Sequence, residues 1–447
     1  MIHSVRMPEQ DRALLLEIVD LQKIILALAT ERTTAFSDEG QEISAHFQAL
    51  PAYQANIDKI TKWFTGKSQL FAWLNQYAQH PDIDAKRALK AAIEVDIELL
   101  LNPLQCRLLA YLPLSKLSTD GWEYGIGKFF YEFYDIWGGA GFQKYLFKPE
   151  TAPDSNYTRS NFVQRFTAKN PNLYICPICD ASSYRNETSS GTYTSLDHFF
   201  PRSLYPYLAI HPLNLLPMCP ACNSGEAGQR DPQESLVSIT DLILPYQGEE
   251  NGLVGRTYVK IGFRPLADNA PKLDGNQPAA HALAFSLEVA ADQEVELLAT
   301  QIKNFEKRYG VQKRWNKDNN LTLIDEHVFR RIRQFLLSDI ERGEPLHDPQ
   351  FLMERLELLM AMIDKQSLGQ DPFSYMMTWW LMYHIKRLEG QKEKIVELAK
   401  DSIDCTTYKM SEEIEPIFAE LYCWAQEQQT MFVDLKEQAK RLRARIL

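Results

Sequence analysis

The sequence lacks any apolar run long enough to cross a lipid bilayer. Its densest apolar stretch, MMTWWLMY at residues 376–383, is far shorter than the roughly 20 residues that a transmembrane helix needs. The first residues, MIHSVRMPEQDR, carry charges early and are followed by no small-residue cleavage site, so they are not those of a secretory signal peptide. We therefore expect a cytoplasmic protein that does not use a membrane.

The chain also lacks an excess of basic residues. Its 59 acidic and 48 basic side chains give a formal net charge of −11 at pH 7. This balance excludes a protein coated in positive charge, such as a DNA packer of the histone kind, but it leaves room for a local basic groove. With 45% apolar and 24% charged residues, the composition is that of a globular protein with a full hydrophobic core.

Several recognition signatures are missing as well. The sequence contains no G-x-x-x-x-G-K-[S/T] stretch, which excludes a nucleotide motor of that class within the chain. It shows no helix-turn-helix or homeodomain signature, and therefore no module of those kinds that reads DNA bases. Any action on nucleic acid is expected to be guided by context or by a partner.

The distribution of residue types predicts a mainly α protein in three domains. Residues 1–150 are expected to form a helical N-terminal domain that docks a partner, senses a trigger or holds DNA. Residues 151–270 are expected to form a small mixed domain with a four-cysteine zinc site and a trailing strand, since residues 151–232 are rich in Pro, Ser, Asn and Cys and in turn signals. Residues 271–447 are expected to form a helical C-terminal domain.

Apolar periodicity predicts individual elements within these domains. Steps of three and four predict helices at 14–28, 81–100 and 352–363, and alternation predicts a strand at 257–263. Residues 121–147 are dense in aromatics, and we interpret them as a buried helix broken by GGAG. A platform that stacks nucleobases is the alternative interpretation of these aromatics.

Seven cysteines, an odd number, favour a reducing compartment. Four of them form two C-x-x-C knuckles, CPIC with Cys176 and Cys179 and CPAC with Cys219 and Cys222. Four thiolates in this pattern predict a closed, tetrahedral and therefore structural zinc site. A redox dithiol would need one knuckle in a thioredoxin-like context, which is missing. The other three, Cys106, Cys405 and Cys423, are expected to be inert core thiols.

Between the knuckles lies LDHFFPRS, residues 196–203, at the end of a predicted short strand, TYTSLDH. HPLNLLP follows with Asn214 in a turn, and CPACNSGEAG places Asn223 after the last cysteine, where a short helix is expected to start. An isolated Asp-His pair is most often a hydrogen-bonded pair without catalytic meaning. A zinc deaminase would need His-x-Glu, and His198 is instead followed by Phe199 and Phe200.

Taken together, these residues resemble the HNH nuclease family, whose ββα-metal fold has two strands and a helix around one divalent ion. The resemblance covers Cys176 to about Arg230 and consists of an acid-His pair, two asparagines and the two knuckles. It is nearest to HNH proteins of bacterial anti-phage defence, in which the nuclease often accompanies an ATPase. The resemblance implies a metal-dependent endonuclease, a phosphodiester hydrolase acting on DNA, with RNA left open.

The resemblance also implies roles for single residues. His198 would be the general base, Asp197 and Asn223 would be ligands of a catalytic Mg²⁺ or Mn²⁺, and Asn214 would brace the loop and orient His198. These types suit the chemistry, because imidazole accepts a proton near pH 7 and hard oxygen ligands suit these ions.

Contacts with the substrate are predicted less directly. Arg202 is a candidate phosphate contact. Many family members carry a lysine shortly after the last asparagine, and this chain does not; Arg230 is the candidate that would replace it. The missing lysine and the acidic balance are the arguments for an alternative function, a catalytically inactive, zinc-stabilised subunit that binds nucleic acid or protein.

The clearest basic stretch lies at 303–333. It predicts either a groove that follows a nucleic-acid backbone or a solvated helix face. Its nine basic residues are Lys303, Lys307, Arg308, Lys313, Arg314, Lys317, Arg330, Arg331 and Arg333. The C-terminal KRLRARIL is a second basic segment with the same two readings, nucleic-acid contact or a favourable helix end.

Overall fold

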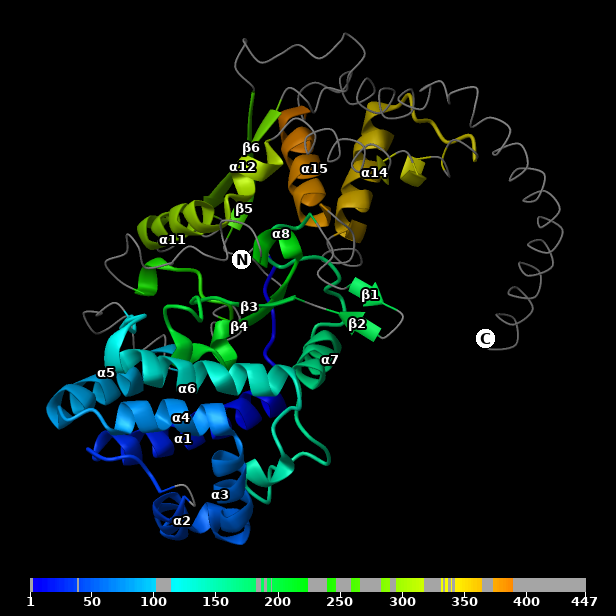
Figure 1. Cartoon of the computed structure of the whole chain (residues 1–447). Helices are drawn as coiled ribbons and strands as arrows, with labels where there is room; N and C mark the ends of the chain where they lie inside the picture. The colour runs from blue at the N-terminus through cyan, green and yellow to red at the C-terminus, as the bar shows by residue number, and fades with distance from the viewer. Residues whose placement is uncertain are drawn as a thin grey trace, which may run out of the picture.

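A computed structural model of the chain describes residues 3–37, 40–101, 114–181, 186–188, 191–193, 195–223, 239–246, 259–265, 283–289, 295–316, 331–332, 334–336, 339, 342–363 and 373–388. Helices dominate this part of the chain, and its strands form three antiparallel pairs. The prediction of a mainly α protein is therefore confirmed (Figure 1). None of the described helices combines the length and apolar character that a membrane crossing requires.

The N-terminal part is a bundle of helices around a large aromatic and aliphatic core. Its elements are α1 (Glu9–Thr30), α2 (Gln41–Gln48), η1 (Pro51–Asn56), α3 (Ile57–Gly66), α4 (Ser68–Ala78), α5 (Ile83–Leu101), α6 (Gly121–Gly138), η3 (Lys144–Leu146) and α7 (Arg159–Lys169). The predicted stripe on α1 is buried at Leu14, Ile18, Leu21 and Ile25, as its periodicity requires. The predicted helix at 81–100 corresponds to α5.

Helix α6 connects the bundle to the middle of the chain. It packs against α4 on one side and lies beside the β3–β4 hairpin on the other (Figure 1). Gly125 permits the close approach to α4, because a Cβ atom there would lie 3.0 Å from the carbonyl oxygen of Trp73. The helix ends at Gly138, where GGAG begins, so the predicted break is confirmed.

The middle of the chain is built from short strands and turns. Its elements are β1 (Asn186–Thr188), β2 (Gly191–Tyr193), β3 (Ser195–His198), η4 (Pro206–Leu208), η5 (Pro212–Asn214), β4 (Leu215–Met218), α8 (Pro220–Asn223), η6 (Ile239–Asp241), β5 (Val259–Pro265) and β6 (Leu283–Val289). The pairs are β1–β2, β3–β4 and β5–β6. The predicted strand at 257–263 is β5, shifted by two residues.

The described C-terminal helices pack back onto this middle part. They are α11 (Val295–Tyr309), α12 (Val311–Trp315), α14 (Pro349–Met362) and α15 (Ser374–Leu388), of which α14 contains the predicted stripe. Asp180, beside the first knuckle, accepts hydrogen bonds from the backbone of Tyr375 and Met376 at 3.1 and 3.2 Å. Oδ1 of the same carboxylate lies 2.6 Å from Nε2 of His3. His3 and the first turn of α15 therefore both contact one buried acid.

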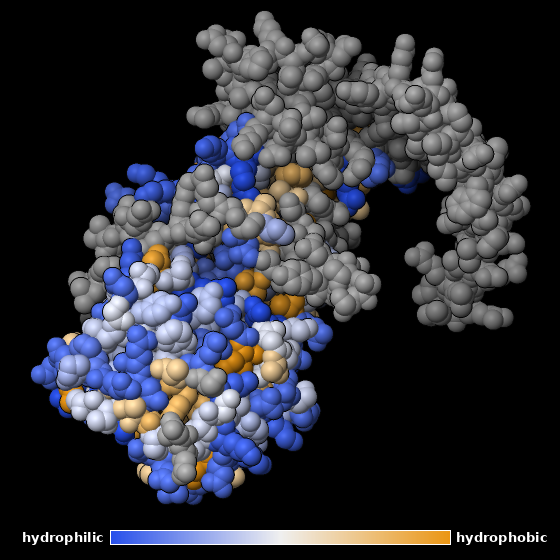
Figure 2. All heavy atoms as spheres, in the orientation of Figure 1, coloured by the Kyte–Doolittle hydropathy of each residue, from blue (hydrophilic) through white to orange (hydrophobic). Residues whose placement is uncertain are grey.

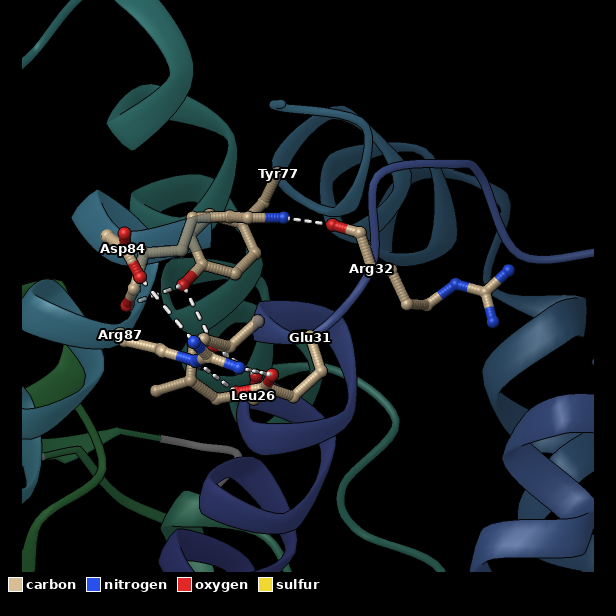
Figure 3. Close-up of polar contacts among 8 residues, drawn as sticks. Leu26, Glu31, Arg32, Tyr77, Asp84 and Arg87 are labelled. Atoms are coloured by element: carbon tan, nitrogen blue, oxygen red, sulfur yellow. Dashed lines mark hydrogen bonds and ion pairs between the residues drawn. The ribbon is translucent and has the colours of Figure 1, made fainter. Parts of the chain in front are cut away.

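A buried lysine joins three helices of the bundle. Lys86 donates through Nζ to the carbonyls of Arg32 and Ala78, at the ends of α1 and α4, and its cation lies 5.6 Å from the ring of Tyr77. Figure 3 shows the surrounding contacts, which include the exposed ion pair of Arg87 with Glu31. Burial lowers the pKa of Lys86. Because its ammonium satisfies carbonyls at helix ends, its role is structural.

Asp11 is a second buried charge, and it holds α7 against α1. Its carboxylate accepts from Arg165 Nε at 2.8 Å and Nη2 at 3.0 Å, and from the hydroxyl of Tyr157 at 2.5 Å. Burial raises the pKa of Asp11, and the hydrogen bonds from Arg165 and Tyr157 act in the opposite direction. This contact positions the start of α7, which carries Arg159.

Replacement of this buried acid should destabilise the fold strongly. We expect Asp11→Ala to lower the free energy of unfolding by about 3–5 kcal/mol, because Arg165 would keep a charge without its partner. Asp20→Ala is the matched control, since Asp20 lies on the same helix with a side chain 56% exposed and should change stability by under about 1 kcal/mol. Chemical denaturation of both variants measures the difference. Equal losses would contradict the assigned role.

Candidate functional site

The four knuckle cysteines come together in the folded chain. All four are buried, and their Sγ atoms lie within 4.8 Å of one another, with 3.8 Å between Cys179 and Cys219. Tetrahedral zinc with Zn–S bonds of about 2.3 Å requires S···S separations of about 3.8 Å. Hydrogen bonds from Cys176, Cys179 and Cys222 lower the pKa of the Cys219 thiol. The donor set and its spacing therefore fit a four-thiolate metal site.

Helix α12 supports this cluster from outside the knuckles. Arg314 Nη2 donates to Cys222 Sγ at 3.2 Å, and Trp315 Nε1 donates to the carbonyl oxygen of Cys179 at 3.0 Å. A guanidinium beside a sulfur offsets the negative charge that four thiolates would concentrate there. The cysteine cluster is thus stabilised by a segment that lies almost a hundred residues further along the chain.

The segment between and after the knuckles contains the short strands β3 and β4 and the short helix α8. β3 pairs antiparallel with β4, so that Asp197 stands opposite Leu216 and His198 opposite Leu215. Helix α8 follows β4 and packs against β3. It begins at Pro220, within the knuckle, whereas the sequence predicted a start at Asn223. The backbone N–H groups of Cys222 and Asn223 both donate to the carbonyl of Cys219, so the knuckle turn itself is the helix.

His198 is buried at the end of β3, with 6% of its surface exposed. Its Nε2 lies 2.9 Å from the carbonyl oxygen of Ala209, so Nε2 carries the hydrogen and Nδ1 carries the lone pair. Its ring meets that of Tyr134 edge-on at 4.5 Å. Burial, followed by the positive charge of Arg202, lowers the pKa of His198 to about 3, which keeps the imidazole neutral.

Asp197 is equally buried, and it faces a different set of residues. Among the described residues its Oδ2 has no hydrogen-bond partner. Burial raises the pKa of Asp197 to about 7, while the nearby charge of Arg308 lowers it. Neighbouring residues of a strand point to opposite faces, and the surroundings of Asp197 and His198 differ accordingly. A buried carboxylate oxygen without a donor is an atom that a cation would satisfy.

Asn214 forms the brace that the sequence predicted for the loop. Its Oδ1 accepts from the backbone N–H of Phe200 at 2.6 Å, and its Nδ2 donates to the carbonyls of Phe200 and Leu208 at 3.1 and 2.9 Å. The backbone N–H of Phe199 also donates to the Asn214 carbonyl at 2.8 Å. These bonds fix the segment that carries Ala209, which in turn holds His198.

Arg202 lies against α6. Its guanidinium stands 4.3 Å from the ring centre of Tyr131 and 4.7 Å from that of Tyr134, and it pairs with Asp135 at 3.4 Å. The side chain is 34% exposed, so the cation remains open to a ligand. Whether it contacts phosphate stays a prediction of the sequence.

A second arginine that the sequence did not single out lies on the same side of His198. The Arg159 guanidinium stands 4.5 Å from the Tyr134 ring centre. It occupies the space over Gly138, where a Cβ atom would come within 1.7 Å of its Nη2. Arg159 and Arg202 both lower the pKa of His198, which shows that both charges act on the imidazole.

The basic stretch at 303–333 divides into two groups. Lys303, Lys307 and Lys313 are exposed, as a solvated face requires. Arg308 is buried instead, 4.5 Å from the ring centre of Phe199, and its Nη2 lies 3.5 Å from the carbonyl oxygen of His198. Arg308 and Arg314 therefore make their contacts inside the site. These two residues fit neither of the predicted arrangements, a nucleic-acid groove or a solvated helix face.

Several predicted residues lie outside the described part of the chain. They are Arg230, Lys317, Arg330 and Arg333, the thiols Cys106, Cys405 and Cys423, and the C-terminal KRLRARIL. Arg331, which belongs to the basic stretch at 303–333, lies in the described part of the chain. His211, close to the site in sequence, is fully buried, and among the described residues neither of its ring nitrogens has a partner.

Comparison with known proteins yields one short match. No protein-family profile matches the sequence, and no solved structure is similar to the chain. A stretch of 54 residues is 39% identical to protein ea31 of Escherichia phage lambda. It covers 12% of this chain and 16% of the phage protein, so the similarity concerns a small part of both.

Proposed function

We propose that the protein is a metal-dependent endonuclease of the HNH type that hydrolyses phosphodiester bonds of nucleic acid, DNA above all. The observation that carries the proposal is the setting of His198. Its Nε2 is held at 2.9 Å by the Ala209 carbonyl, which leaves Nδ1 to accept a proton from water. Arg202 and Arg159 lie over the ring of Tyr134, which meets His198 edge-on, and they would receive the charge of a phosphate there.

Two metals belong to the proposal. Zinc would be held by the four cysteines, whose spacing fits it, and would have a structural role because no coordination position is left open. Magnesium or manganese would be held by Asp197, whose Oδ2 has no hydrogen-bond donor in the described part of the chain, together with Asn223 of α8. When bound, this ion supplies Lewis acidity toward a phosphate oxygen.

Residues of the chain itself carry out the remaining steps of the proposed reaction. His198 takes a proton at Nδ1 from the attacking water once the negative phosphate offsets the charges of Arg202 and Arg159. Burial, followed by these charges, otherwise holds the pKa of His198 low. Asn214 keeps the Ala209 carbonyl in place during this step. Arg202 receives the phosphate, and Arg230 is proposed to contact it as well. The resemblance to HNH nucleases of bacterial anti-phage defence supports a role of this activity in anti-phage defence or restriction. The partner would be an ATPase or another defence protein.

A second candidate function is a zinc-stabilised subunit that binds nucleic acid or protein without cutting. The observation in its favour is that Asp197 and His198 are each only 6% exposed. A nuclease must open this site or admit only a narrow substrate, whereas a binding subunit need do neither.

Metal removal separates the two candidates. We expect the purified protein, with or without its partner, to nick supercoiled plasmid in Mg²⁺ or Mn²⁺ and to stop when a chelator is added, because Asp197 would lose its cation. Zinc content measured in the same samples controls for loss of the structural ion, and added Mg²⁺ should restore cleavage. Absence of cleavage under every condition would decide for the binding subunit.

A further inference from the structure

The outer face of α6 carries a row of alternating aromatic rings and cations that leads to His198. The Lys128 ammonium stands 5.2 Å from the ring centre of Tyr124 and 5.5 Å from that of Tyr131. Arg202 then lies over both Tyr131 and Tyr134, and Arg159 lies over Tyr134. Tyr134 meets His198 at 4.5 Å, so the row ends at the imidazole.

The spacing on α6 explains why these groups are aligned. Tyr124, Lys128, Tyr131, Asp135 and Gly138 follow one another at steps of four and three, which places them on one stripe of the helix. Tyr124, Lys128 and Tyr131 are half-buried, and the residues on the opposite stripe, such as Phe129 and Phe133, are in the core. Figure 2 shows mixed hydrophilic and apolar patches on the described face of the molecule. The half-buried side chains of Tyr124, Lys128 and Tyr131 leave part of this stripe open to a ligand.

The two arginines come from other elements and are fitted to this stripe. Arg159 begins α7 and passes over Gly138, where a Cβ atom would collide with its guanidinium. Within the described residues no carboxylate forms an ion pair with Arg159, so its charge is not neutralised. A cation held this specifically over a ring, next to a buried histidine, is placed to receive an anion.

We propose that this row, Tyr124, Lys128, Tyr131, Arg202, Tyr134 and Arg159, binds a single-stranded segment of nucleic acid and leads its backbone to His198. The inference rests on the proposed function and deepens it by naming the form of the substrate. Cations contact successive phosphates, and the half-buried rings of Tyr124 and Tyr131 give unpaired bases a stacking surface. The buried ring of Tyr134 supports the two arginines from below. Arg159 and Arg202 grip the phosphate nearest to the imidazole.

A double strand fits this face less well. Duplex DNA carries about one negative charge per 1.7 Å of its axis and keeps its bases stacked inside, so it would meet only the cations. Three cations on a face that also holds Asp135 and Glu132 do not provide the charge density that a duplex requires. A single strand has half that density and offers its bases to the tyrosines.

Binding measured without cleavage tests the row. We would measure fluorescence anisotropy of the full-length protein, without added Mg²⁺ or Mn²⁺, on labelled single-stranded DNA, single-stranded RNA and duplex DNA of one sequence. We expect the single strands to bind more tightly than the duplex. Lys128→Ala should weaken single-strand binding about tenfold and reduce the slope of log affinity against log salt by about 0.7. Tyr131→Ala should weaken it by a similar factor through lost stacking.

Gly138→Ala is the sharpest variant, because it leaves every charge and ring in the row. The added methyl displaces the Arg159 guanidinium, while alanine is a better helix former than glycine by about 1 kcal/mol. We expect unchanged or raised thermal stability together with a loss of single-strand affinity. Lys23→Ala, which removes an α1 lysine that is paired with Asp20, is the matched control and should change neither.

The outcomes distinguish the two proposals. If Lys128→Ala, Tyr131→Ala and Gly138→Ala all bind single strands with wild-type affinity, the proposed role of the row in binding is wrong, even if the protein cuts nucleic acid. Preference for duplex would also overturn it. A protein that binds single strands through these residues but never cuts them would support the row and contradict the proposed nuclease function.

Discussion

His198→Ala should reduce nucleic-acid cleavage by about 10²–10⁴-fold, which is the usual contribution of a general base. The reason is geometric. The Ala209 carbonyl fixes the proton on Nε2, so Nδ1 is the nitrogen that can accept one from water. Alanine removes this acceptor and leaves Arg159, Arg202 and the cysteine cluster in place. Plasmid nicking under single-turnover conditions measures the loss.

Two controls separate loss of the base from loss of the fold. His347→Ala removes an exposed histidine and should leave cleavage unchanged. His198→Gln keeps a donor for the Ala209 carbonyl and should restore much of the packing against Tyr134 without restoring activity. Both His198 variants should retain the zinc content of the wild type. Full activity of clean His198→Ala protein would contradict the assignment of the base.

Sequence periodicity predicted the elements whose side chains obey one simple pattern. The α1 stripe of Leu14, Ile18, Leu21 and Ile25, the strand β5 and the helix α14 all have such patterns, and all are present. The start of α8 was predicted too late, at Asn223 and not at Pro220, because the C-x-x-C turn satisfies its backbone through the Cys219 carbonyl and is already helical. Turn geometry of this kind leaves no periodic signal.

The candidate site could be predicted only where its residues are close in sequence. Asp197, Asn214 and the cysteines lie within one stretch, whereas Arg159, Tyr134 and Arg308 reach the same place from distant helices. No local pattern indicates that Arg308 and Arg314 turn inward, because an inward arginine depends on a partner supplied by the tertiary fold. A glycine directly opposite an arginine, as in Gly138 and Arg159, is likewise visible only in three dimensions.

Helix α6 shows why composition alone left two readings open. Its aromatic residues predicted either a buried helix or a platform for bases. The structure places Phe129, Phe130 and Phe133 in the core, while Tyr124 and Tyr131 remain half-buried on the other face. The buried-helix interpretation is therefore confirmed for the core side of α6, and the platform for bases stays a prediction for the half-buried side, since residues three or four apart share a face and intervening ones do not.

Cys222→Ser should remove one zinc per chain and lower the thermal midpoint by on the order of ten degrees, or abolish soluble expression. Structural zinc contributes about 10–16 kcal/mol of apparent binding free energy in small domains, and that energy is available only to the folded state. A serine hydroxyl is a poor substitute for a thiolate in a four-sulfur site. Metal analysis of the purified protein and a thermal scan measure the two effects.

The effect should extend beyond the cluster, because three parts of the chain meet there. Arg314 donates to Cys222, Trp315 donates to Cys179, and Asp180 caps α15 while it contacts His3. Loss of the metal would release the knuckle turns to which Arg314 and Trp315 donate. Strand β3, which carries His198, would then lose the support of the cysteine cluster. Cys423→Ser is the matched control and should keep zinc, stability and activity. A Cys222→Ser protein with full zinc content and an unchanged midpoint would show that the cluster holds no structural ion.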